Sequence, residues 1–203
     1  MRMIGNSEKE KIIDIVDLHR KAFPSFFLTQ LGTSFLKTLY LGYVEDSESG
    51  IIVAEKDGLL LGFIAFSKDY SGFFKRILRR YFLRFALSSM IAAIRHPQFI
   101  KRLLGAFSKS EEVEKKDRYV ELASICVNPE SEGQGIGTEL VKYLISTIDL
   151  NYYKYISLET DAENNEKANG FYLKNGFILS RQYVTSEGRK MNEYRYMQVS
   201  NEL

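Results

Sequence analysis

A short glycine-rich segment separates a strand-like stretch from a helix-like stretch of this chain. Residues 131–138 read SEGQGIGT, the apolar run 122–127 precedes them, and a helical pattern extends over residues 135–150. Glycines at such a junction let consecutive backbone N–H groups point at a ligand beside the positive N-terminal end of a helix, which is a site for phosphate. The segment therefore predicts an α/β fold that binds a phosphate-bearing ligand.

Two common nucleotide-binding patterns do not fit this segment. A Walker A loop requires G-x-x-x-x-G-K-[ST], which the sequence lacks. A Rossmann fingerprint requires G-x-G-x-x-G, whereas this loop reads G-x-G-x-G and continues with Thr138. Glu159, near the end of the next predicted strand, would suit a ribose hydroxyl. However, about 120 residues precede the loop, and a dinucleotide-binding fold usually begins with this unit.

A second segment favours a different phosphate ligand. Residues 165–177, NEKANGFYLKNGF, resemble the pattern N-x-x-A-x-x-F-Y-x-x-x-G-F of the GCN5-related N-acetyltransferases, the GNAT superfamily. Residues 132–137, EGQGIG, resemble the acetyl-CoA loop of the same superfamily, Q/R-x-x-G-x-G/A. The two motifs follow in the superfamily's order, separated by one predicted helix and one predicted strand. One position departs from the pattern: Glu132 replaces Gln or Arg, and a carboxylate there cannot attract phosphate.

The hydrophobic pattern along the chain predicts a mixed α/β fold. Asp57-Gly58 and Glu187-Gly188 mark two hairpin turns, and Ser7 with Glu10 is expected to cap the first helix. The resemblance implies a GNAT-like, mixed and mostly antiparallel twisted sheet flanked by helices, in a single domain over residues 1–203. Strands are expected over residues 2–4, 51–56, 59–66, 119–127, 155–160, 177–184 and 192–199, and helices over 7–24, 31–40, 135–150 and 165–174.

A basic segment interrupts this resemblance between the third and fourth predicted strands. Residues 72–108 are expected to form a helical insertion, broken at Pro97. We leave three interpretations open: helices that pack their aromatic residues on the domain, a lid that attracts an anionic acceptor such as a nucleotide-linked amino sugar, and weak contact with a membrane surface. Nucleic acid binding is not expected, because no recognition motif is present. Residues 70–110 contain no acidic residue and nine basic ones: Lys75, Arg76, Arg79, Arg80, Arg84, Arg95, Lys101, Arg102 and Lys109.

Composition excludes several other classes of protein. The single cysteine, Cys126, cannot form an internal disulfide, and no Cys/His cluster indicates a metal site. His19 and His96 are expected at the surface or packed within helices. The N-terminal sequence MRMIGNSEKEK lacks the apolar core of a signal peptide, and no run approaches 18 apolar residues. We therefore expect a cytoplasmic protein without a bound metal.

Acetyl transfer from a thioester to an amine requires a neutral amine, a stabilised carbonyl oxygen and a proton for the leaving thiolate. The resemblance implies that Glu121, on the strand leading into the loop, is the base, as a glutamate is in the histone acetyltransferases of the superfamily. Glu159 is the rival for this role, and an exposed carboxylate without a catalytic role is the alternative for Glu121. The resemblance places Tyr172 beside the cofactor thiol as the acid; the alternative is an aromatic residue packed on the sheet.

The remaining candidate residues are expected to contact the cofactor. Asn165 is expected to contact it or to cap the helix that follows. Cys126 is expected to be an inert strand residue, since no neighbouring His or Lys would lower its pKa. The predicted cofactor-binding residues are Ile125, Cys126, Val127, Gly133, Gln134, Gly135, Ile136, Gly137, Thr138, Asn165, Ala168 and Tyr172.

Together these features predict an acetyl-CoA-dependent N-acetyltransferase that acts by direct attack in a ternary complex. The acceptor is expected to be a small-molecule or peptide amine, and its identity and the oligomeric state stay open. Two alternatives remain: a CoA-binding sensor or regulatory module without turnover, and a peripheral membrane protein that uses its basic insertion.

Overall fold

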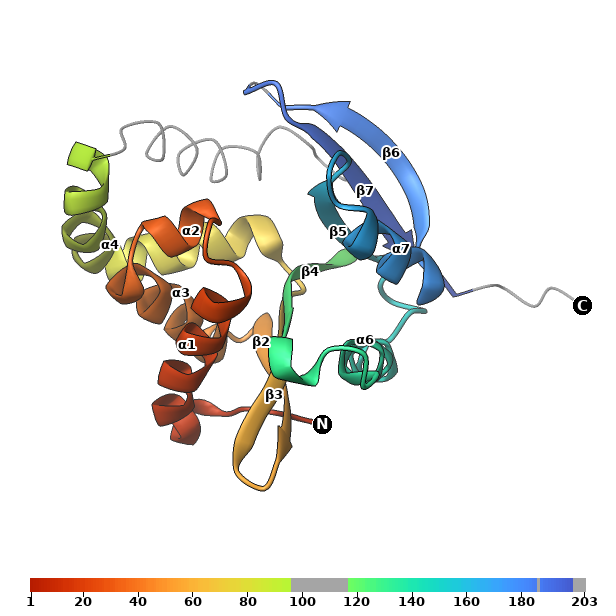
Figure 1. Ribbon diagram of the computed structural model, residues 1–203, viewed down its shortest axis with the longest axis horizontal. Helices are drawn as coiled ribbons and strands as arrows, with labels where there is room; N and C mark the ends of the chain where they lie inside the picture. The colour runs from red at the N-terminus through yellow and green to blue at the C-terminus, as the bar shows by residue number, and fades with distance from the viewer. Residues whose placement is uncertain (96–116, 186, 199–203) are drawn as a thin grey trace, which may run out of the picture.

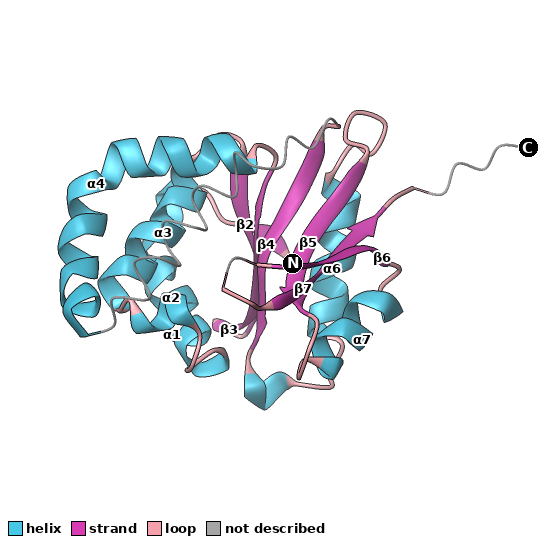
Figure 2. Ribbon diagram, turned by 90° about the horizontal axis from the view of Figure 1, so that it is seen from above, coloured by secondary structure: helices cyan, strands magenta, loops and turns pink. Residues whose placement is uncertain are grey.

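The computed structural model describes residues 1–95, 117–185 and 187–198, which form one seven-stranded sheet with helices on both faces (Figures 1 and 2). The strand order is β1-β2-β3-β4-β5-β7-β6. Parallel pairing is found between β4 and β5, and the other five pairings are antiparallel. The predicted mixed, mostly antiparallel sheet is thus confirmed. The strands are β1 (Arg2–Met3), β2 (Ser49–Lys56), β3 (Leu59–Ser67), β4 (Tyr119–Val127), β5 (Tyr155–Asp161), β6 (Ile178–Val184) and β7 (Lys190–Tyr196).

The helices divide between the two faces of the sheet, as Figure 2 shows. One face is covered by α1 (Ile12–Ala22), α3 (Thr33–Glu45) and α4 (Tyr70–Arg95). The other face is covered by α6 (Ile136–Thr147) and α7 (Glu166–Lys174). The short helices are η1 (Asn6–Lys11), α2 (Phe27–Gln30) and η2 (Pro129–Ser131). Within the described residues, no helix is long and apolar enough to cross a membrane.

Several predicted element boundaries are wrong for local reasons. The first helix was expected to be capped by Ser7 and Glu10, but η1 follows Gly5, whose N–H donates to the Glu8 carboxylate at 3.4 Å. Arg2 holds the same carboxylate at 2.7 Å, which favours this start. The helix expected over residues 135–150 ends at Thr147, because Ile148 is extended. The final strand begins and ends earlier than the expected residues 192–199.

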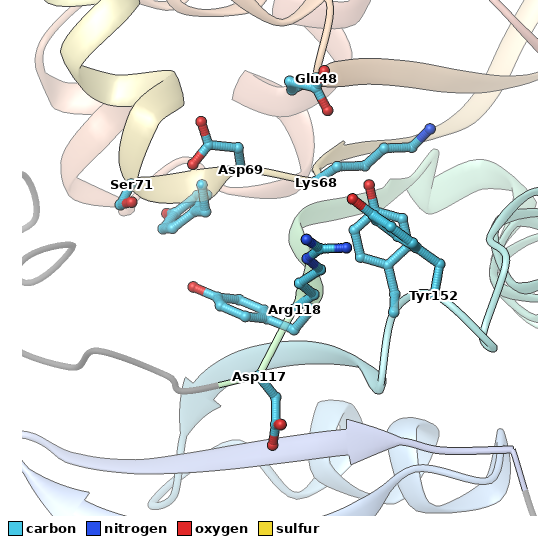
Figure 3. A pocket seen from close by; sticks show the side chains of 10 residues that line it. Glu48, Lys68, Asp69, Ser71, Asp117, Arg118 and Tyr152 are labelled. Carbon is cyan, nitrogen blue, oxygen red and sulfur yellow. The ribbon is translucent and has the colours of Figure 1, made fainter.

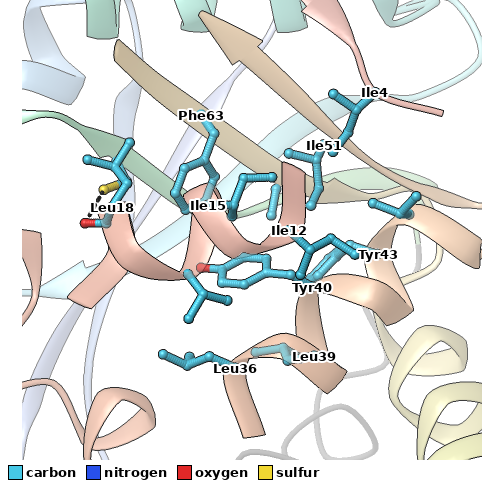
Figure 4. Close-up of a cluster of buried hydrophobic side chains, with 14 of the residues drawn as sticks. Ile4, Ile12, Ile15, Leu18, Leu36, Leu39, Tyr40, Tyr43, Ile51 and Phe63 are labelled. Carbon is cyan, nitrogen blue, oxygen red and sulfur yellow. Dashed lines mark hydrogen bonds between the residues drawn. The ribbon is translucent and has the colours of Figure 1, made fainter. Parts of the chain in front are cut away.

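Two hydrophobic clusters hold the layers together. In the first, large apolar residues of α1 and α3 pack on β2 and β3, with Tyr40 and Phe63 in edge-to-face contact at 5.3 Å (Figure 4). In the second, Leu140 and Leu144 of α6 form one cluster with Ile52 of β2 and Ile64 of β3. Burial of such side chains stabilises the fold by about 1.5–3 kcal/mol each. The two clusters fix the sheet between its helical layers.

The described part of the basic insertion is one long helix, and it belongs to the first cluster. Phe73, Ile77 and Phe85 of α4 are buried against α3. Gly42 of α3 allows this approach, because a Cβ there would lie 2.8 Å from a side-chain carbon of Ile77. The insertion is therefore a structural layer and not only a surface appendage. The helical piece predicted after Pro97 lies outside the described residues.

His19 is a buried member of the first cluster. Its Nδ1 lies 2.7 Å from the Tyr40 hydroxyl, and its Nε2 has no hydrogen-bond partner in the part of the chain that the structure describes. Burial disfavours the charged ring and lowers the pKa of His19 from 6.5 to about 4. His19 thus lies in the core, and it contacts Tyr40 in addition to packing within a helix.

The buried His19 predicts a loss of stability in mild acid. Below pH 6.5 the unfolded chain binds a proton at His19, whereas the folded protein binds it only near pH 4. The stability of the folded state is therefore at its full value above pH 6.5 and decreases as the pH falls toward 4. We expect the free energy of unfolding to decrease by about 2 kcal/mol from pH 7 to pH 5, at about 1.4 kcal/mol per pH unit below 6.5. Denaturant unfolding of the wild type and of His19→Gln, which cannot titrate, measures this. Equal pH slopes for both proteins would contradict the assignment.

Candidate active site

The glycine loop presents backbone N–H groups at the start of α6. Gly133 and Gly135 have φ angles of +78° and +80°, in the left-handed region that favours glycine. The Glu139 N–H donates to the Gly135 carbonyl at 3.0 Å and is the first N–H paired within the helix. The N–H groups of residues 136–138 precede it and have no intrahelical partner. The loop therefore has the geometry of an anion site, as the sequence predicted.

The two sequence motifs contact each other across α6 and α7. A Cβ at Gly137 would lie 3.1 Å from a ring carbon of Phe171, so glycine lets the first turn of α6 approach α7 closely. Ala168 and Phe171 pack against the second hydrophobic cluster, which includes Tyr172. The motif residues thus bring the anion loop and Tyr172 to the same face of the sheet.

The parallel strands β4 and β5 form a fork that opens at Glu121. Their register pairs Tyr119 with Tyr155 and ends at the pair Glu121–Ser157. Beyond this point β5 continues its pairing with β7. Within the described ranges, residues 122–127 of β4 have no strand on their β5 side, so the backbone groups of Ile125, Cys126 and Val127 border an open edge. Backbone amides along such an edge can bind an extended amide-containing chain.

A bulge in β4 lies beside this fork. Phe66 of β3 pairs with Leu122 and Ala65 pairs with Ser124, so Ala123 has no opposite residue in β3. An extra residue bends a strand and re-aims its side chains. Leu122 accordingly packs in the second cluster, whereas Cys126, which would share its face in a regular strand, packs in the first. The bulge thus marks the place where β4 turns away from β5.

Tyr172 is buried in α7 and keeps its proton. Its ring contacts Phe177 at 5.9 Å and Tyr194 at 5.8 Å. Burial raises the pKa of Tyr172 to about 12, so the phenol is protonated at neutral pH. Among the described residues, no hydrogen bond of its hydroxyl is found. The group is therefore able to donate a proton to a ligand.

Glu121 lies at the vertex of the fork, on the face opposite α6. It is buried, and Ser67 of β3 and Ser157 of β5 are its register partners. Burial raises the pKa values of Tyr70 and Tyr119, and the negative charge of Glu121 raises them further. The carboxylate and the two phenols therefore belong to one polar group beside the sheet.

Glu159 lies on the same face, two residues beyond the fork, because alternate residues of a strand share a face. It accepts a hydrogen bond from the Tyr183 hydroxyl at 2.6 Å, and Arg181 lies 3.9 Å away. These partners hold the Glu159 carboxylate toward β6, whereas Glu121 lies at the fork itself.

Sequence reasoning missed other members of this polar face. Glu193 of β7 is fully buried and accepts from Nε of Arg181 at 2.5 Å and from Nε of Arg195 at 2.8 Å. The Arg195 guanidinium lies 4.2 Å from the centre of the Tyr155 ring. The sequence signal that could have identified this face is the alternation of polar residues along the strands. They stand at positions 119 and 121, at 155, 157 and 159, and at 193 and 195. This alternation places these side chains on one face.

A pocket of about 240 Å³ adjoins the polar face where β4 begins (Figure 3). Tyr70 and Tyr119 belong to both the pocket and the polar face. Arg118 stacks on Tyr152 at 4.4 Å from the ring centre. The pocket thus offers both signs of charge and several phenol rings next to Glu121. Its lining comprises Glu48, Lys68, Asp69, Tyr70, Ser71, Asp117, Arg118, Tyr119, Tyr152 and Tyr153.

The asparagines of the second motif attach α7 to the sheet. Asn165 occupies the N-cap position of α7 but makes no side-chain cap; its Nδ2 donates to Thr160 Oγ1 of β5 at 2.7 Å. Asn169, which the motif does not specify, forms hydrogen bonds through both Nδ2 and Oδ1 of its side-chain amide. Its Nδ2 donates to the carbonyls of Asp161 and Asn165. Its Oδ1 accepts from Asn192 Nδ2 and from the Tyr194 hydroxyl of β7.

Glu132, the departure from the loop pattern, pairs with a residue of the second motif. Lys167 Nζ of α7 lies 2.5 Å from its carboxylate. Both side chains are exposed, so the pair contributes little to stability. It does neutralise the carboxylate beside the anion loop, which removes the charge conflict that the sequence alone indicated.

Cys126 is a buried strand residue, as expected. Its thiol donates to the Leu18 carbonyl at 3.6 Å, which Figure 4 shows as a dashed line. Burial raises the pKa of the Cys126 thiol to about 12. The side chain therefore stays protonated and packs against α1, while its backbone belongs to the open edge of β4.

The comparisons identify the family. Residues 12–177 match the sequence model of the Acetyltransferase (GNAT) family. This span includes the anion loop, the fork and the second motif, and the chain belongs to the GNAT acetyltransferase family. The acetyl donor of this family is acetyl-CoA. None of the curated proteins compared with the chain matches it.

Solved structures of low sequence identity share this fold. An acetyltransferase of the GNAT family from Bacillus cereus superposes with a TM-score of 0.59 at 13% identity, over 98% of this chain and 96% of that chain. The ribosomal-protein-S18-alanine N-acetyltransferase from Escherichia coli superposes with a TM-score of 0.54 at 14% identity, over 99% of this chain and 96% of that chain. A "putative streptothricin acetyltransferase" from Bacillus anthracis, in complex with acetyl coenzyme A, superposes with a TM-score of 0.51 at 16% identity. The superposition covers 79% of this chain and 68% of that chain. At these identities the likeness establishes the fold and not the acceptor.

Proposed function

We propose that this protein transfers the acetyl group of acetyl-CoA to a primary amine by direct attack in a ternary complex. The observation that carries the proposal is the register break at Glu121–Ser157. It opens the edge of β4 between the anion loop and Tyr172 on one face and Glu121 on the other. Donor and acceptor can therefore approach the fork from opposite faces of the sheet.

The donor side fits acetyl-CoA. The N–H groups of residues 136–138 suit its phosphates, since they lie at a helix N-terminus that attracts negative charge. The open edge of β4 suits the amides of its pantetheine arm, and the small residues Gly137 and Ala168 leave room beside it. Acetyl-CoA is also the ligand of the Bacillus anthracis structure that shares this fold.

On the acceptor side, Glu121 is the proposed base. A lysine-like amine has a pKa near 10.4, and forming its neutral state at pH 7 costs about 4–5 kcal/mol. A buried carboxylate at the fork can accept this proton, directly or through water. Glu159 is the weaker candidate, because Tyr183 and Arg181 already hold its carboxylate.

Tyr172 is the proposed acid. As the amine attacks the acetyl carbon, the thioester C–S bond breaks and the sulfur leaves as a thiolate. A phenol with a raised pKa stays protonated and is able to supply the proton. The Cys126 thiol is buried and protonated, which argues against an acetyl-cysteine intermediate and supports direct attack.

The acceptor is proposed to bind on the polar face and in the adjoining pocket. An anionic acceptor such as a nucleotide-linked amino sugar would need cations there. In the described part of the insertion, however, no Lys or Arg lines the pocket. Arg76 instead pairs with Asp46 and Asp69, and Arg80 pairs with Glu45. Lys68 and Arg118, which lie outside the insertion, do line the pocket. The described part of the insertion therefore does not supply the attraction for an anionic acceptor, and the acceptor is proposed as a small-molecule or peptide amine.

Titration calorimetry and a thiol-release assay test the proposal. We expect acetyl-CoA and CoA to bind, and free CoA to appear only when a suitable amine from a mixed panel is added. No CoA binding at millimolar concentration would contradict the whole proposal. CoA binding without release by any amine would instead support the sensor or regulatory module.

The Glu132–Lys167 pair gives a separate prediction for donor binding. Lys167→Ala should weaken CoA binding by about three- to tenfold at low salt, because it leaves an unpaired carboxylate beside the phosphates. Adding Glu132→Gln should restore the affinity, and calorimetry measures both. Lys190→Ala, which removes the similar exposed pair with Glu163, is the matched control. If the double variant instead loses CoA affinity by the sum of the two single losses, Glu132 and Lys167 are not coupled.

A further inference from the structure

The second half of α4 carries an apolar stripe on its outer side. Phe82, Leu83 and Leu87 are 64%, 71% and 67% exposed. Leu83 and Leu87 are four positions apart and share one side of the helix. Phe82 lies about 100° from Leu83 around the helix axis, at the border of this side. Phe85 on the opposite side is buried and contacts Phe35 of α3 at 5.0 Å. The stripe therefore points away from the core, and the packing of α4 does not explain it.

Arginines lie next to this stripe, and α4 itself has no acidic residue, although Glu45 of α3 pairs with Arg80. Arg79, Arg80 and Arg84 precede or interrupt the exposed apolar residues, and neither Asp nor Glu occurs from Tyr70 to Arg95. Arg84 lies 5.4 Å from the centre of the Tyr81 ring. The surface formed by residues 79–87, called here the outer α4 face, combines exposed apolar side chains with positive charge.

A kink at Tyr81 places this face at the edge of the molecule. Tyr81 has non-helical backbone angles, φ −119° and ψ 22°, and its hydroxyl donates to Glu45 of α3. Figures 1 and 2 show α4 bending here, so that its second half forms the side of the protein farthest from α6 and α7. The outer α4 face is therefore separate from the donor loop.

We propose that the outer α4 face docks on a bilayer that contains anionic lipid. The three apolar side chains would enter the boundary between headgroups and acyl chains, and Arg79 and Arg84 would face lipid phosphates. A second copy of this chain fits less well, because two such faces would bring like charges together. This attachment is independent of the acetyl transfer proposed above.

Co-sedimentation of the full chain with vesicles tests the proposal. We expect binding to vesicles of phosphatidylcholine and phosphatidylglycerol at low salt, little binding to phosphatidylcholine alone, and release at high salt. The triple variant Phe82→Ser, Leu83→Ser, Leu87→Ser should bind the anionic vesicles about tenfold more weakly. The matched control is Leu59→Ser, Ile178→Ser, Val184→Ser, whose side chains are 68%, 51% and 61% exposed elsewhere. It should bind like the wild type.

Three results would overturn the proposal. The wild type could fail to sediment with anionic vesicles at low salt. The triple variant could bind as tightly as the control variant while both melt at the wild-type temperature. Light scattering could show a dimer that the triple variant loses, in which case a second copy of the chain covers the face.

Discussion

Tyr172→Phe is expected to lower kcat by about 10²–10³-fold, since a positioned acid contributes about 10²–10⁴-fold to such reactions. Without the hydroxyl the sulfur leaves as an unprotonated thiolate. The affinity for acetyl-CoA should change little, because the ring and its contacts with Phe177 and Tyr194 remain. Steady-state kinetics with calorimetry on the same preparations measures both quantities. Folding should be unaffected, since the hydroxyl makes no hydrogen bond within the described residues.

Tyr196→Phe is the matched control for this variant. Tyr196 contacts Phe177 at 5.7 Å and packs against the same cluster, but no role in proton transfer is assigned to it. We expect nearly wild-type kcat. Equal losses in both variants would indicate that packing, not proton donation, accounts for the effect of Tyr172.

Glu121→Gln is expected to lower kcat/KM by about 10²–10⁴-fold at pH 7, because the amide cannot accept the proton of the amine. The loss should shrink as the pH rises toward the pKa of the acceptor, where more of the amine is neutral without a base. A pH profile of kcat/KM for wild type and variant measures this. The change preserves the size of a buried side chain, and thermal unfolding checks that the protein stays folded.

Glu159→Gln decides between the two carboxylates. We expect a loss below about tenfold, because Glu159 is held by Tyr183 and Arg181 away from the fork. A large loss with Glu159→Gln and a small one with Glu121→Gln would reverse the assignment. Large losses in both would show that the acceptor needs the charge of the whole face.

The parts of this site that the sequence predicted are local. Gly133, Gly135 and Gly137 lie within five consecutive residues, and their spacing defines a loop whatever the rest of the fold is. Phe171 and Tyr172 are adjacent in the second motif, so the signal that they give is equally local. These signals require only a few neighbouring residues, and the resemblance to GNAT sequences supplied the roles.

The parts that the sequence did not predict depend on distant pairings. Glu121 and Glu159 are both strand carboxylates, and only the register with Ser157 shows which of them lies at the fork. His19 was expected at the surface or within a helix because Tyr40, its hydrogen-bond partner, lies 21 residues away. Tyr70 reaches the polar face only because α4 packs on α3. Register and packing of this kind are set by the whole sheet and not by any short segment.

The attachment of α7 by Asn169 has a mechanical consequence. Its amide ties the helix to β5 and β7, so Tyr172 travels with that arm of the fork, while Glu121 travels with β4. The spread of the two arms therefore sets how far the proposed proton donor, Tyr172, lies from the proposed proton acceptor, Glu121.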